Sequence, residues 1–78
     1  MTQPIYQEAL NLSAVWASYF PAIPVATEYW RLMLDSYPSE IIVAAIKRCV
    51  RKKLALNGTF TLEHMLAYIE SVCHQESA

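Results

Sequence analysis

Glycine is nearly absent from this chain of 78 residues, which contains a single one, Gly58. A backbone loop that cradles phosphate groups depends on glycine, so the sequence excludes that kind of nucleotide site. The longest uninterrupted apolar run covers only residues 41–46, far below the roughly 20 residues of a transmembrane helix. The first residues also lack the basic and then apolar pattern of a signal peptide. We therefore expect a cytoplasmic protein without membrane attachment.

Sequence patterns for catalysis and metal binding are missing as well. His64 and His74 lie ten residues apart, and with Cys49 and Cys73 they form no CxxC, HxxxH or HExxH motif. A cysteine nucleophile needs a base within hydrogen-bond reach, but both cysteines lie on or beside apolar helix stripes, which favours packing thiols. We predict a protein that is not an enzyme and binds no metal and no cofactor. We expect both thiols to be reduced, although the sequence also allows one bridge between them.

Hydrophobic residues make up 55% of the chain, above the usual share of roughly 45–50%. A chain this short buries only about 60% of its unfolded surface, so its small core could need all of this apolar material. The alternative is an apolar surface for a homodimer or for another partner protein. The residues predicted to meet in one core are Leu12, Trp16, Trp30, Leu34, Ile46, Val50, Leu66 and Ile69.

Apolar residues recur at helical spacing in four segments, and prolines separate the first three of them. Pro21 and Pro24 end the first segment, and Pro38 lies between the second and the third. The Thr27 hydroxyl is suited to cap the second helix, and Thr59 and Thr61 are both possible caps for the fourth. No strand-like alternation occurs. We predict an all-α, compact bundle of about four short helices, in one domain spanning residues 1–78, with helices at residues 4–20, 27–37, 38–56 and 61–75.

The basic residues are concentrated in one short stretch. Five of the six lie within residues 47–53, whereas the rest of the chain has Arg31 against seven acids. One interpretation is contact with nucleic-acid phosphates or with an acidic protein surface. The other is a solvated helix end whose cations offset the helix dipole. The residues of this predicted partner-binding patch are Lys47, Arg48, Arg51, Lys52 and Lys53.

Some large apolar residues fall outside the apolar stripes. Most aromatic residues lie on the stripes, for which core packing is the expected role. The others could instead form an exposed recognition surface. This second candidate site consists of Tyr6, Leu10, Tyr29, Leu32 and Tyr68.

Part of the chain resembles a known family. Residues 29–38 read YWRLMLDSYP, residues 42–48 read IVAAIKR, and residues 57–65 read NGTFTLEHM. This succession of a tryptophan-bearing helix, a YP turn, a basic helix and a threonine-rich turn resembles the N-terminal domain of phage replicative-helicase loader/inhibitor proteins, over residues 12–72. The resemblance implies a helical domain that acts on a hexameric helicase in DNA replication. Family members contact the helicase through a C-terminal tail, so no binding residue is carried over.

Three functional hypotheses follow. The leading one is a phage-type protein-interaction module, related to helicase loaders, that acts by protein–protein contact. The second is a small nucleic-acid-binding protein that uses the basic third helix, which we do not favour because the rest of the chain is acidic. The third is a phage-encoded inhibitor of a host defence system or host enzyme.

Overall fold

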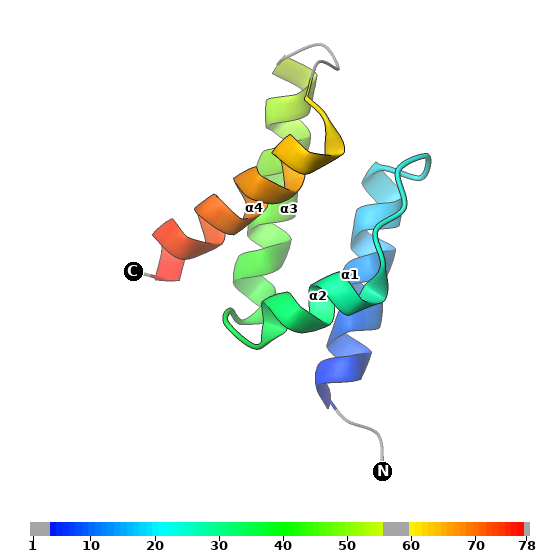
Figure 1. Ribbon diagram of the computed structural model, residues 1–78, viewed down its shortest axis with the longest axis vertical. Coiled ribbons are helices and arrows are strands. Elements are labelled where there is room, and N and C mark those ends of the chain that lie inside the picture. Colours follow the sequence, from blue (N-terminus) through cyan, green and yellow to red (C-terminus); the bar gives the residue numbers. More distant parts are fainter. Residues whose placement is uncertain (1–3, 56–59, 78) are drawn as a thin grey trace. The chain divides into compact units, whose positions relative to one another are not determined.

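The computed structural model describes residues 4–55 and 60–77, with side chains from residue 6 onward in these ranges (Figure 1). These ranges contain no strand and four helices. The predicted all-α class with about four short helices is therefore confirmed. The helices are α1 (Pro4–Tyr19), α2 (Thr27–Leu34), α3 (Ser39–Ala55) and α4 (Leu62–Ser77).

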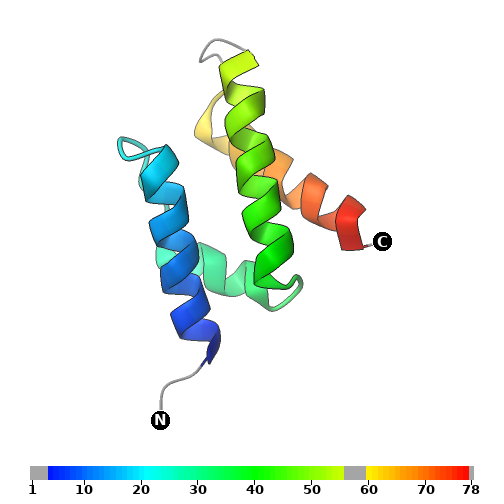
Figure 2. The same cartoon turned by 180° about the vertical axis from the view of Figure 1, so that it is seen from behind.

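Contacts divide the chain into two compact units, Met1–Ser39 and Glu40–Ala78. The first unit contains α1 and α2, and the second contains α3 and α4 (Figures 1 and 2). The prediction of one domain with one core common to all four helices stays a prediction. Of the helices in the described ranges, none has the length and apolar character needed to cross a membrane.

The helix boundaries lie within two residues of the predicted ones, except at the end of the second helix. We predicted that the second helix ends near Tyr37, but α2 ends at Leu34. The N–H groups of Asp35 and Ser36 donate to carbonyls three residues earlier, at 3.2 and 3.1 Å, which tightens the last turn into 3₁₀ geometry. Pro38 disfavours helical geometry only in Tyr37, the residue before it, and so does not account for an end at Leu34.

Of the predicted helix caps, the one for the second helix is wrong. Thr27 does not cap α2: the N-cap is Ala26, which makes no side-chain capping bond. The Thr27 hydroxyl instead lies 3.0 Å from that of Ser13 on α1, so a contact between the two helices replaces the local cap. At α4 one of the two candidates is confirmed, because the His64 N–H donates to the Thr61 hydroxyl at 3.3 Å, whereas Thr59 lies outside the described residues. The predicted last residue of the third helix, Leu56, lies outside the described residues.

In the first unit, α1 and α2 pack around two tryptophans. The ring centroids of Trp16 and Trp30 are 5.7 Å apart, and Phe20 lies 4.5 Å from Trp16. The indole N–H of Trp16 donates to the Ile23 carbonyl at 2.6 Å. This bond holds the proline-containing link between the helices against α1.

The buried face of the second unit differs from the predicted one. Of the eight residues predicted for the core, Leu34, Val50 and Leu66 are only half-buried, whereas the other five are buried. On α3 the buried stripe is turned toward the small residues Ala45 and Cys49, since small side chains allow a neighbouring helix to come close. The buried apolar residues of α3 and α4 are Ile42, Ala45, Ile46, Cys49, Met65, Ile69, Val72 and Cys73.

The two tryptophans predict different responses to the same substitution. Both are buried, but the indole nitrogen of Trp30 has no hydrogen-bond partner among the described residues. Trp16→Phe loses a hydrogen bond and deprives the Ile23 carbonyl of its donor, which costs about 1–3 kcal/mol. Trp30→Phe removes the same atoms but also an unsatisfied donor. In guanidinium titrations, we expect Trp16→Phe to be the less stable variant by about 1 kcal/mol. A larger loss of unfolding free energy for Trp30→Phe than for Trp16→Phe would contradict this assignment of the hydrogen-bonded and the unsatisfied indole.

Candidate basic site on α3 and α4

The described residues form an open depression of about 340 Å³ in the second unit. It is lined by Arg48, Arg51 and Lys52 of α3 and by Tyr68 of α4. We call these four residues and the space between them the basic depression. Three cations beside one aromatic ring form a site suited to an anionic group attached to an apolar one.

The helical period of α3 places these cations on its outer face. Lys47, Arg48, Arg51 and Lys52 are all exposed, opposite the buried stripe. Lys52 also lies in the last turn of α3, where a cation interacts favourably with the negative end of the helix dipole. The prediction of a solvent-facing basic patch agrees with the exposure of these four residues.

One of the depression's cations has an ion-pair partner. The Nη2 atom of Arg48 lies 3.2 Å from the Oε1 atom of Glu76 on α4, and both side chains are about half exposed. Within residues 4–55 and 60–77, Lys47, Arg51 and Lys52 have no ion-pair partner. The depression therefore has a net positive charge even where a carboxylate already neutralises Arg48.

Lys53 lies apart from the other basic residues. Its ammonium group donates to the Phe60 carbonyl at 3.2 Å, and its side chain is half-buried. The bond joins the end of α3 to the residues before α4. Lys53 is therefore a structural contact of this unit, although the sequence placed it in the partner-binding patch.

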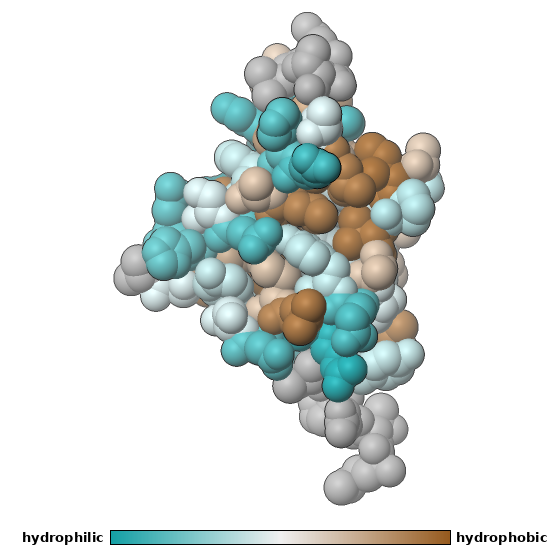
Figure 3. All heavy atoms as spheres, viewed as in Figure 1, coloured by the Kyte–Doolittle hydropathy of each residue, from teal (hydrophilic) through white to brown (hydrophobic). Residues whose placement is uncertain are grey.

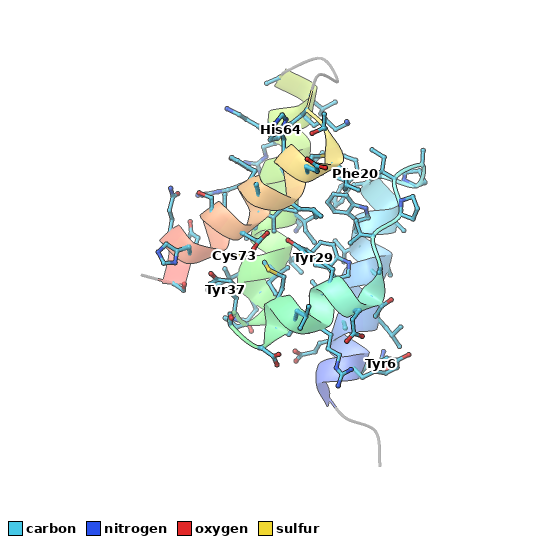
Figure 4. The ribbon with its side chains drawn as sticks, in the orientation of Figure 1. Tyr6, Phe20, Tyr29, Tyr37, His64 and Cys73 are labelled. Atoms are coloured by element: carbon cyan, nitrogen blue, oxygen red, sulfur yellow. The ribbon has the colours of Figure 1, made fainter. Side chains whose placement is uncertain are left out.

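The predicted exposed apolar site is divided between the two units. Tyr6, Leu10 and Leu32 are exposed, at 51%, 39% and 62%, and belong to the first unit with Tyr29. Tyr29 is half-buried, and its ring packs edge-on against that of Trp30 at 5.1 Å (Figure 4). Tyr68 belongs to the second unit and lines the basic depression. Hydrophobic residues do reach the surface among hydrophilic ones (Figure 3).

Reasoning from the sequence missed two residues of α4, one that lines the basic depression and one that pairs with Arg48. Tyr68 was assigned to the apolar patch, and Glu76 was assigned no role. Both come from α4, some 20 to 28 residues after Arg48 in the chain. No local pattern connects them with the cations, because only the packing of α4 on α3 brings them there.

The cysteines show the environment of packing residues. Cys49 and Cys73 are free and buried. Burial raises the pKa of Cys49 from 9.0 to about 11, while nearby Lys53 opposes this rise. Burial also raises the pKa of Cys73 to about 11, and the charge of Glu70 adds to the effect. In the described part of the chain, no three His, Cys, Asp or Glu side chains are grouped so that they could hold a metal ion.

Comparison with protein-family models, with curated protein sequences and with solved structures finds no match to this chain.

The raised thiol pKa values predict slow alkylation of the folded protein. At pH 8, a thiol with a pKa of about 11 has roughly a hundredth of the thiolate of one with a pKa of 9.0. We expect iodoacetamide to label Cys49 and Cys73 at least about 100-fold more slowly in the folded than in the guanidinium-unfolded protein.

The same pKa values predict how stability changes with pH. The folded thiols keep their protons up to about pH 11, whereas unfolded thiols ionise near pH 9.0. The stability that the protonated, buried thiols contribute is present below pH 9.0 and is therefore lost as the pH rises toward 11.

The alkylation prediction has its own contrary outcome. Rapid labelling of both thiols at pH 8 without unfolding would exclude the burial of Cys49 and Cys73.

Proposed function

We propose that this chain is a non-enzymatic protein-interaction module that binds an acidic surface of a partner protein through the basic depression. The observation that supports it is the set of exposed cations, Arg51 and Lys52 beside Arg48, gathered with Tyr68 around one open space. Arg51 and Lys52 have no ion-pair partner among the described residues. Their charges are therefore available to an anionic ligand.

A protein partner is favoured over nucleic acid by the distribution of charge. Outside residues 47–53 the chain has one basic residue and seven acidic ones. Nucleic-acid-binding domains usually carry a basic net charge, because affinity comes from many phosphate contacts. One small cationic site on an acidic chain instead suits a local patch of carboxylates, which it attracts over short distances and orients.

The sequence resemblance suggests which partner to test first. If the chain is a relative of phage helicase loader/inhibitor proteins, the partner is a replicative helicase or another protein of DNA replication. A host enzyme or defence protein with an acidic surface is the alternative partner. Both candidate partners would bind at the basic depression, so one set of variants tests either candidate.

The test is a charge reversal in the depression. In a pull-down from a lysate of the bacterial host, we expect Arg48→Glu/Arg51→Glu to lose the partner that the unaltered protein captures. The captured protein is then identified, purified and titrated. Each lost surface ion pair is worth about 0.2–1 kcal/mol, so the double reversal should weaken binding by about 2- to 30-fold. The free energy of unfolding, followed by thermal denaturation, should change by no more than about 0.5 kcal/mol.

A matched pair of lysine variants controls for net charge. Lys47 and Lys52 are both exposed on α3, but only Lys52 lines the depression. Lys52→Glu should weaken binding clearly more than Lys47→Glu. Equal effects would indicate general charge attraction, and no effect of the double reversal would refute the proposal. Tight binding of short DNA in a gel shift at about 0.15 M salt, where the Debye length is about 8 Å, would favour a nucleic-acid ligand instead.

A further inference from the structure

The structure contains its own example of a carboxylate paired with one cation of the basic depression. Glu76, near the end of α4, lies 3.2 Å from Arg48, one of the residues that line it. Both side chains remain about half exposed, and exposed ion pairs of this kind contribute little to stability. A carboxylate from another molecule can therefore replace that of Glu76 at small cost.

The spacing of the two arginines indicates the geometry of the ligand. Arg48 and Arg51 are three residues apart on an exposed helix face. Side chains at this spacing are neighbours, with their Cβ atoms about 5–6 Å apart. Two carboxylates at positions i and i+4 of a second helix have the same separation. In an extended segment, consecutive side chains point to opposite faces, and those on one face are about 7 Å apart. A helix therefore matches the arginine pair better.

Small residues leave room for a helix along the same face. Ala44 is exposed one turn before Arg48, and Ala55 is exposed one turn after Arg51. The two alanines are eleven residues apart, which is about 16 Å along the helix axis. Their side chains end at Cβ, so they do not hold a partner backbone away from the arginines.

We propose that the basic depression binds an acidic α-helical segment that presents two carboxylates one turn apart. One carboxylate contacts Arg51 and Lys52, and the other takes the place of Glu76 on Arg48. An apolar side chain of the segment rests on the ring of Tyr68. This inference rests on the proposed function and specifies the chemistry of the partner at that site.

Synthetic helical peptides test the spacing of the carboxylates. Three alanine- and glutamine-based peptides of equal length carry two glutamates at i and i+4, two glutamates at i and i+2, or glutamine in place of both. Circular dichroism confirms that they have equal helicity. In NMR titrations of ¹⁵N-labelled protein up to millimolar peptide, the i,i+4 peptide should bind most tightly. Its shifts should be centred on Arg48, Arg51, Lys52 and Tyr68.

The exchange of Glu76 has its own matched variants. Glu76→Gln frees Arg48, so binding of the i,i+4 peptide should tighten about two- to fivefold, as expected for the release of one exposed ion pair. Glu63→Gln removes the same charge from the first turn of α4, where Glu63 has no ion-pair partner among the described residues. This control should leave binding unchanged.

The outcomes separate this inference from the proposed function. It is overturned if the i,i+4 and i,i+2 peptides bind equally, if neither binds, or if Glu76→Gln has no greater effect than Glu63→Gln. It is also overturned if a short DNA duplex displaces the i,i+4 peptide at equal concentration. If the purified partner still depends on Arg48 and Arg51 in these cases, the proposed function stands. If the partner is indifferent to that double reversal, the proposed function itself fails.

Discussion

The close approach of α3 and α4 at Cys49 is the contact on which the basic site depends. The Cys49 sulfur lies 3.8 Å from the Met65 carbonyl of α4, a separation that larger side chains at this point would not allow. The polypeptide has Cys49 at this contact instead of one of its larger aliphatic residues. With the helices this close, Tyr68 lines the depression beside the arginines and Glu76 reaches Arg48.

Charge segregation gives this small protein a directional surface. Under the proposed function, an acidic chain with one cationic site attracts a carboxylate-bearing partner in one orientation and repels other anions elsewhere. One of its cations, Lys52, also lies in the last turn of α3, where it offsets the helix dipole. The contact of Glu76 with Arg48 neutralises one of the three cations of the depression. Arg51 and Lys52 remain without an ion-pair partner in the described ranges, so the net charge of the depression stays positive.

The first unit has a different character. Its two helices are held by aromatic packing and by the contact between the Ser13 and Thr27 hydroxyls, and the Trp16 indole donates to the Ile23 carbonyl of the link between them. It also exposes large apolar side chains, of which Leu32 is the most exposed at 62%. Isolated apolar residues are normal on protein surfaces. The basic depression, with its charges and defined lining, is therefore the better candidate for a specific contact.

The sequence by itself determined the helices and the exposure of most of the basic residues. Periodicity and proline positions are local properties, so four helices and the outward direction of Arg48 and Arg51 follow from them. Only the tertiary structure decided which small residue lies at the contact between α3 and α4. It also decided that Thr27 contacts Ser13 instead of capping α2, and that the Lys53 ammonium group bonds to the Phe60 carbonyl. It also decided that Tyr68 and Glu76 join the arginines. These outcomes depend on which faces of two helices meet, and the spacing of residues along one helix does not contain that information.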